Sequence, residues 1–258
     1  MRRPYYNAGM HDPYLHALHE ATRISAPVPV DQSKWPEAWK TVGFKQYRRF
    51  PSILLPEPTL SESTYADVLR RRSSNPRFDV GTSLPLQSLS DILYAGAGIS
   101  RNKEHPERSF RFYPSGGARY PLELYLATHA VEGIPRSIYH YDVRRHALER
   151  VTGEDAVETI RAVDTYPWIR DAAVIGLVSA VLDRTTQKYG RRGYRFALIE
   201  TGCLLHNLYL AASASGRGFC ALGTDIDAAI ESLLDLDTEQ ERYILGFAVG
   251  TSLPDSHA

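Results

Sequence analysis

Two stretches of the sequence carry residues that suit opposite ends of a flat, phosphorylated ligand. Arg70-Arg71-Arg72 followed by Ser73 combines guanidinium forks with a hydroxyl donor, and such groups bind phosphate. In Pro114-Ser115-Gly116-Gly117 the glycines have no Cβ, so the backbone can approach a flat ring closely, and Ser115 adds a donor. In isolation, a solvated basic helix end explains the first stretch, and an ordinary turn before a strand explains the second.

Lys188 and Tyr189 are the residues best suited to transferring a proton. Both side chains have ordinary pKa values of roughly 10, so either acts as a proton acceptor or donor only where its site lowers that pKa. The arginines at 191, 192 and 195 would disfavour the ammonium and favour the phenolate. An exposed lysine beside an anchoring tyrosine is the alternative, and composition does not reject it.

Hydrophobic periodicity predicts the elements that must position these residues. Thr64 with Asp67 resembles a capping box that opens a helix ending near Arg71, and Ser88 with Asp91 opens a second helix, which Gly98 ends. We place Lys188-Tyr189 on a loop between a buried strand and the clearest helix of the chain. That helix covers 191–215 and is closed by Gly216; further helices are expected at 13–24, 155–163 and 226–234, and strands at 122–128, 138–142, 147–151, 172–180, 219–222 and 243–249.

Length and composition exclude several classes of protein. The 30 Lys and Arg residues balance 30 Asp and Glu residues, so no whole-surface attraction to nucleic acid or membrane is expected. Apolar runs are too short to span a bilayer and no signal peptide is visible, which indicates a cytoplasmic protein. Cys203 and Cys220 are expected to be buried free thiols, and His140 and His146 lie in a hairpin without a set of cysteines or carboxylates, so no metal site is expected.

The first 60 residues differ in composition from the rest of the chain. A short helix is followed by a proline-rich stretch with scattered aromatic residues, which cannot form a core by itself. We therefore divide the chain into an N-terminal extension, 1–60, that wraps around a body or a second subunit, and a domain, 61–258. Strands and helices do not alternate regularly, so the order is α+β.

Taken in order, the motifs closely resemble those of the SagB-type dehydrogenases, a branch of the nitroreductase-like flavoproteins. The resemblance covers roughly 61–250 and rests on Arg-Arg-Ser, Pro-Ser-Gly-Gly-Ala-Arg-Tyr-Pro-Leu-Glu-Leu-Tyr, Ile-Tyr-His-Tyr-Asp and Lys-Tyr-Gly-x-Arg-Gly-Tyr-Arg-Phe-Ala-Leu-Ile-Glu-Thr-Gly. It implies a nitroreductase-like FMN-binding fold, with a central, mainly antiparallel sheet flanked by helices. It also implies an interlocked homodimer with FMN at the subunit interface.

The resemblance also assigns roles to residues. Arg71, Arg72 and Ser73 would hold the phosphate and ribityl end of FMN, the Pro-Ser-Gly-Gly loop would contact the isoalloxazine from the other subunit, and 221–223 would lie along the flavin. One departure is that 249–254 offers no basic residue for the phosphate, so another group, such as Arg77 or Arg195, must substitute. The cofactor-binding set is Arg71, Arg72, Ser73, Pro114, Ser115, Gly116, Gly117, Ala221, Leu222 and Gly223.

The function that the resemblance implies is oxidation of thiazoline or oxazoline rings in a peptide to azoles, in natural-product biosynthesis. Lys188 or Tyr189 would remove a ring proton, hydride would pass to flavin N5, and dioxygen would reoxidise the flavin. The peptide would be ribosomal or carrier-bound, with a cyclodehydratase or synthetase as partner. Two alternatives stay open: an NAD(P)H-dependent nitro or quinone reductase, and a non-catalytic flavin-binding scaffold, against which the intact Lys-Tyr pair argues.

Overall fold

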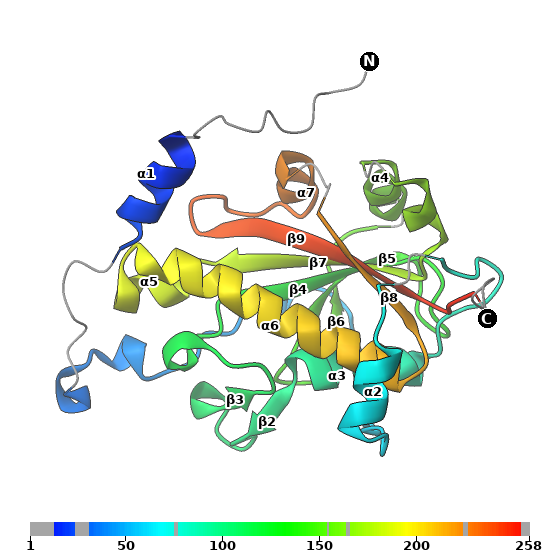
Figure 1. The fold of residues 1–258 in the computed structure, drawn as a ribbon, viewed down its shortest axis with the longest axis horizontal. Helices are drawn as coiled ribbons and strands as arrows, with labels where there is room; N and C mark the ends of the chain where they lie inside the picture. Colours follow the sequence, from blue (N-terminus) through cyan, green and yellow to red (C-terminus); the bar gives the residue numbers. More distant parts are fainter. Residues whose placement is uncertain are drawn as a thin grey trace.

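A seven-stranded sheet lies at the centre of the computed structural model, which describes residues 13–23, 31–74, 77–153, 155–163, 166–223 and 227–253 (Figure 1). Its strand order is β1-β6-β5-β4-β7-β9-β8, and each neighbouring pair is antiparallel. A separate hairpin joins β2 to β3. The strands are β1 Ser52–Leu54, β2 Ile99–Arg101, β3 Phe110–Arg111, β4 Leu122–Thr128, β5 Ser137–Asp142, β6 Ala147–Arg150, β7 Val174–Val181, β8 Gly218–Leu222 and β9 Glu241–Gly250.

Helices cover both faces of the sheet, so its central strands are buried on both sides. Side chains alternate along β4: Leu124 and Leu126 pack on the side of α3 and α6, whereas Tyr125 and Ala127 pack on the side of α4 and α7. The long helix α6 crosses the first face diagonally (Figure 1). The helices are α1 Pro13–Ala21, α2 Tyr65–Arg71, α3 Leu86–Ala97, α4 Asp155–Val163, α5 Asp183–Tyr189, α6 Arg192–Ala214 and α7 Asp227–Leu233.

The described part of the N-terminal extension is built into the sheet domain. Strand β1 pairs with β6 at the sheet edge, and short 3₁₀ turns at 32–34 and 37–39 precede it. Lys45 Nζ lies 2.5 Å from Glu241 Oε2 and 2.6 Å from the Tyr125 hydroxyl, and the Tyr47 amide donates to Glu149. The extension is thus anchored by buried charged groups.

The fold confirms the predicted α+β class, and most elements lie within two residues of their predicted ends. Two positional predictions were wrong. Helix α3 begins at Leu86, directly after Pro85, and the Ser88 hydroxyl accepts from Arg217 instead of capping the helix. Lys188 and Tyr189 end helix α5 instead of lying on a loop. Strand β1 was not predicted.

The prediction that His140 lacks carboxylates around it was also wrong. Its Nε2 lies 2.8 Å from Glu123 and its Nδ1 lies 3.1 Å from Glu149. Although burial lowers the pKa of His140, these carboxylates raise it to about 9. Within the described ranges, no group of three or more His, Cys, Asp or Glu side chains could hold a metal ion, and none of the helices combines the length and hydrophobicity that a membrane span requires. Cys203 and Cys220 are free but only partly buried.

Candidate functional site

The glycine loop, Pro114–Gly117, leads from β3 into β4 and has a strained backbone. Gly117 has φ +65°, and the non-glycine residues Ala118 and Tyr120 have φ +53° and +44°. Such left-handed conformations cost free energy in residues with a Cβ and are concentrated at functional sites. The loop is held because the Ser115 hydroxyl accepts from the Tyr120 amide at 2.9 Å.

Lys188 and Tyr189 meet the glycine loop at Gly117. A Cβ placed on Gly117 would lie 2.8 Å from Lys188 Nζ and closer still to the Tyr189 hydroxyl. Any residue with a Cβ at position 117 would therefore displace the Lys188 and Tyr189 side chains or the loop. The structure thus brings together the two motifs that sequence analysis had considered separately.

Two arginines fix helix α5, and with it the Lys188-Tyr189 pair, against the loop. Arg184 forms an ion pair with Glu123 at 2.6 Å and donates to the Tyr120 carbonyl at 3.1 Å. The Arg119 guanidinium donates in turn to the Arg184 carbonyl at 2.9 Å. Helix α5, which carries the pair, is therefore linked directly to the segment that follows the glycine loop.

The N-terminal extension covers this part of the site, which the sequence did not indicate. Arg119 donates to the carbonyls of Ala38 and Thr41, at 2.7 and 2.8 Å. The same segment lays the Trp35 ring over Lys188, with Nζ 3.6 Å from the ring centroid. As a result Lys188 is only 6% exposed.

Burial and nearby charges shift the pKa values of the two candidate proton-transfer groups in opposite directions. The pKa of Lys188 is lowered, which is the predicted direction, but the causes are burial and then Arg119, not the arginines at 191, 192 and 195. The corresponding prediction for Tyr189 was wrong: burial raises its pKa, the Arg119 guanidinium only partly opposes this rise, and the charge of Glu200 adds a smaller one. These shifts move Lys188 toward the neutral amine and Tyr189 toward the protonated phenol.

A second cluster gathers around Tyr209 in the C-terminal half of α6. The Arg72 guanidinium lies 5.6 Å from the Tyr209 ring centroid, and the Tyr209 hydroxyl lies 3.0 Å from the Ser74 hydroxyl and accepts from the Ala221 amide at 2.9 Å. Tyr209 thus joins the predicted Arg-Arg-Ser and 221–223 segments. In the latter, Leu222 is buried and a Cβ on Gly223 would meet open space.

A small hollow of about 160 Å³ beside Tyr209 has the composition of an anion site. Guanidinium groups and hydroxyls are the usual ligands of phosphate, and none of the described residues that line this hollow is acidic. Arg217 was not singled out as a ligand because a helix-ending glycine run explained its surroundings. The lining residues are Arg71, Ser73, Tyr209, Ser213, Gly216, Arg217, Gly218, Phe219 and Ser252.

Arg195, one of the two residues expected to complete a phosphate site, does not line this hollow. Its Nε donates to the Thr22 hydroxyl at 2.6 Å, and another of its nitrogens donates to the His19 carbonyl, so it holds the end of α1. Arg77 is not among the residues that line the hollow. Arg217 stands there instead and also donates to Ser88 and Thr251.

Within one chain the two clusters lie toward opposite ends of α6. The glycine loop contacts Glu200, through a 2.9 Å hydrogen bond from the Gly116 amide, whereas the hollow reaches Ser213. Thirteen residues of helix separate Glu200 from Ser213, which is about 20 Å. Figure 1 shows the same separation, with α5 at one end of α6 and α2 near the other.

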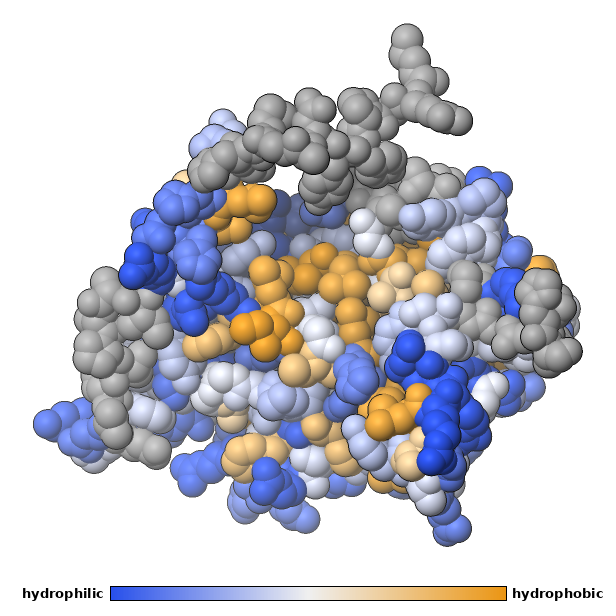
Figure 2. All heavy atoms as spheres, viewed as in Figure 1, coloured by the Kyte–Doolittle hydropathy of each residue, from blue (hydrophilic) through white to orange (hydrophobic). Residues whose placement is uncertain are grey.

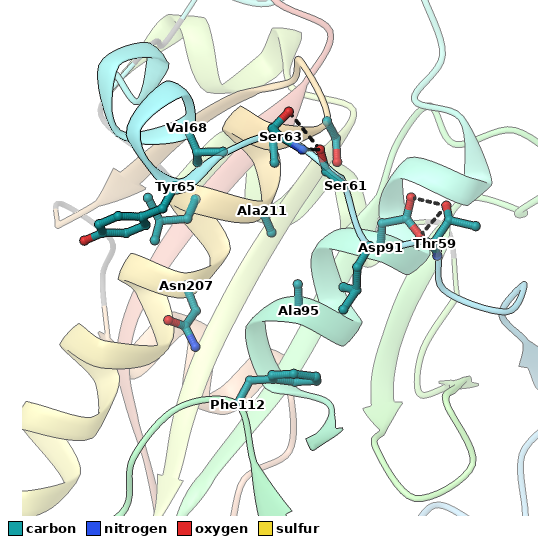
Figure 3. A pocket seen from close by; sticks show the side chains of 14 residues that line it. Thr59, Ser61, Ser63, Tyr65, Val68, Asp91, Ala95, Phe112, Asn207 and Ala211 are labelled. Carbon is teal, nitrogen blue, oxygen red and sulfur yellow. Dashed lines mark hydrogen bonds between the residues drawn. The ribbon is translucent and has the colours of Figure 1, made fainter. Parts of the chain in front are cut away.

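A larger cavity of about 450 Å³ lies between the segment 59–63, α2, α3 and α6 (Figure 3). Asn207 and Ala211 of α6 face it, as do Val68 and Phe112. None of the predicted site residues lines it. Phe112 lies two residues before the glycine loop, so this cavity borders the candidate site without belonging to it.

Comparison with known proteins identifies nitroreductases as relatives of this chain. The model of the nitroreductase family matches residues 68–251. A protein of Methanocaldococcus jannaschii described as a nitroreductase is 33% identical over 180 residues, covering 69% of this chain and 88% of that protein. The microcin B17-processing protein McbC of Escherichia coli is 29% identical over 137 residues, and the match spans 49% of each chain.

One solved structure with a similar fold is the E. coli microcin synthetase McbBCD complex with truncated pro-microcin B17 bound. The match has a TM-score of 0.61 at 20% identity and covers 95% of this chain and 95% of that one. At this level of identity the likeness concerns the fold alone.

Proposed function

The chain belongs to the nitroreductase family, and on that premise we propose that it is a SagB-type, FMN-dependent dehydrogenase that oxidises azoline rings of a peptide to azoles. The observation that carries the proposal is the meeting of Lys188 and Tyr189 at Gly117. Lys188 as proton acceptor and Tyr189 as hydroxyl donor then face the glycine loop, which we expect to contact the flat flavin ring.

The cofactor is FMN, the flavin of this family, and the residues present fit it. Arg71, Ser73 and Arg217 supply the guanidinium and hydroxyl groups that a phosphate needs, and Pro114, Ser115 and Gly117 of the glycine loop line a cavity of about 510 Å³. When bound, FMN supplies the two-electron acceptor for the carbon–hydrogen bond that breaks. The phosphate would therefore be held at the Tyr209 cluster.

The first prediction concerns Arg217. Replacing Arg217 with alanine removes one of the guanidiniums of the hollow, so we expect FMN to dissociate with a Kd about tenfold to a hundredfold higher. Arg195→Ala is the matched control, because Arg195 holds α1 instead. Flavin fluorescence on dilution measures both constants, and equal values for the two variants would contradict the assignment.

We propose further that the active form is a homodimer in which two copies of α6 pack antiparallel. Leu198 and Ile199 on this helix are 41% and 62% exposed, and a Cβ on Gly202 would meet open space. Figure 2 shows hydrophobic side chains gathered in the middle of the face that α6 crosses. An antiparallel pair centred near Gly202 would place the glycine loop of one copy near the Tyr209 cluster of the other.

The second prediction follows from the open space at Gly202. Gly202→Glu should leave the protomer folded, since nothing in it lies near the new side chain, yet place two carboxylates in the helix pair. We expect a monomer in light scattering and loss of FMN on gel filtration. Ala228→Glu, on exposed α7, is the control and should change neither. A Gly202→Glu protein that stays dimeric and yellow would overturn this arrangement.

In the proposed reaction Lys188 and Tyr189 have different roles. The Lys188 amine, whose pKa is lowered, accepts the ring proton alpha to the carbonyl, while the protonated Tyr189 hydroxyl donates a hydrogen bond that orients the ring. Trp35 excludes water from the amine. A cyclodehydratase or synthetase partner would form the azoline in a ribosomal or carrier-bound peptide, as the likeness to McbC suggests, and dioxygen would be the final acceptor.

Anaerobic mixing in two cuvettes tests the function. The yellow protein should bleach with a synthetic thiazoline or oxazoline peptide, and the peptide should lose two mass units. Rapid bleaching by NADPH with no response to any azoline would favour the alternative of a nitro or quinone reductase and overturn the proposal.

A further inference from the structure

A buried carboxylate, Glu200, lies directly beneath the glycine loop. Glu200 is 3% exposed, its Oε1 accepts from the Gly116 amide at 2.9 Å, and its Oε2 has no hydrogen-bond partner among the described residues. Burial of a charged group without a cation is costly, so such a residue needs an explanation.

Glu200 and Phe196 lie one helical turn apart and together support the loop. The Phe196 ring lies 3.1 Å from where a Cβ on Gly116 would stand, and it also packs edge-to-face on Tyr189 with centroids 4.9 Å apart. The same face of α6 thus contacts both the loop and the Lys188-Tyr189 pair.

The titratable groups facing Glu200 come from three directions. Tyr113 and Tyr120 flank the loop, and Tyr189 ends α5. Burial raises the pKa of each phenol, and the Glu200 charge adds a smaller rise. Within the described ranges Glu200 forms no salt bridge. Burial raises the pKa of Glu200 itself to about 7, opposed by the Gly116 amide and the Ser115 hydroxyl.

We propose that Glu200 is a positioning residue of this site: it fixes the glycine loop through the Gly116 amide, and when ionised its charge favours the hydrogen-bond-donating form of Tyr189. It acts through Gly116 and Tyr189 and does not itself touch the reacting ring. The inference rests on the proposed function in taking Tyr189 as that donor.

Glu200→Ala and Glu200→Gln separate the two roles. Alanine removes the acceptor for the Gly116 amide, and we expect FMN to bind about tenfold more weakly. Glutamine keeps an acceptor oxygen, so FMN binding should stay within about twofold. Because glutamine carries no charge, the alkaline limb of its kcat–pH profile should move to lower pH by up to about one unit.

The matched control is Glu231, another buried glutamate that accepts a backbone amide, from Tyr243, on the opposite side of the sheet. Glu231→Gln and Glu231→Ala should leave both the FMN affinity and the pH profile unchanged. If Glu200→Gln gives the wild-type profile and Glu200→Ala binds FMN normally, the proposal is overturned.

A stability measurement keeps the test independent of turnover. The raised pKa of Glu200 means that the unfolded chain ionises near pH 4.5 while the folded protein stays protonated to about pH 7, so wild-type stability falls across that window. Glu200→Gln should therefore show a higher Tm than wild type above pH 7 and no advantage below pH 4.5. A gain in Tm that does not vary with pH would contradict the buried carboxylate, whatever the substrate proves to be.

Discussion

Replacing Gly117 with alanine is expected to lower azoline oxidation at least about a hundredfold, because a reacting group displaced by about 1 Å can cost that much. The alanine Cβ would overlap the Tyr189 hydroxyl and lie 2.8 Å from Lys188 Nζ, so the pair or the loop must move. The φ of +65° adds about 1 kcal/mol of backbone strain. The kcat for a thiazoline peptide and the Tm measure the two effects.

Gly133 provides the matched control for this substitution. It has φ +70°, but a Cβ there would meet nothing within 4 Å. Gly133→Ala should therefore show a similar loss of stability, about 1 kcal/mol, and full activity. Equal activities for the two alanine variants would mean that contact with Lys188 and Tyr189 is unimportant.

The other large effect is expected at the pair itself. Lys188→Met keeps the length of the side chain under Trp35 but removes the amine, and a missing general base costs about 10²–10⁴ in kcat. Tyr189→Phe removes one hydrogen-bond donor, for which about tenfold to a hundredfold is expected. Both variants should stay yellow, because neither residue lies in the hollow proposed for the phosphate.

Two further measurements check this assignment. Lys103 also lies over an aromatic ring, 4.9 Å from the centroid of Tyr94, but is exposed, so Lys103→Met should keep full activity. With a lowered pKa on Lys188, wild-type activity should be lost as the pH falls through that pKa and the amine becomes charged. A Lys188→Met enzyme with wild-type kcat, or Tyr189→Phe with none of the expected loss, would contradict the division of roles.

Local patterns in the sequence predicted much of the fold. The capping box at Thr64, the left-handed Gly216 and the apolar run of β7 are short-range signals, and the corresponding elements formed as predicted. Strand β1 was missed because three residues at a sheet edge carry little periodicity. Helix α5 was missed because Asp183–Tyr189 has weak helix formers, and ion pairing through Arg184 stabilises it from outside.

The site could be predicted only where its residues lie in motifs. The glycine loop and Lys188-Tyr189 were predicted separately, and the fold placed them in contact. Trp35 and Arg217 have no local signal, because their roles depend on partners far along the chain. The pKa of Tyr189 was misjudged because counting neighbouring arginines ignores burial, which has the larger effect.

The contact between Lys45 and Glu241 sets an order of events during synthesis on the ribosome. The two residues are 196 positions apart, so at about 5–20 residues per second Lys45 emerges roughly 10–40 s before its partner. Strand β9, which lies between β7 and β8 in the sheet, is also not yet complete at that stage. Arg119 and Lys188, which hold the Trp35 segment, emerge earlier, so the cover over the amine can form before the ion pair that anchors Lys45.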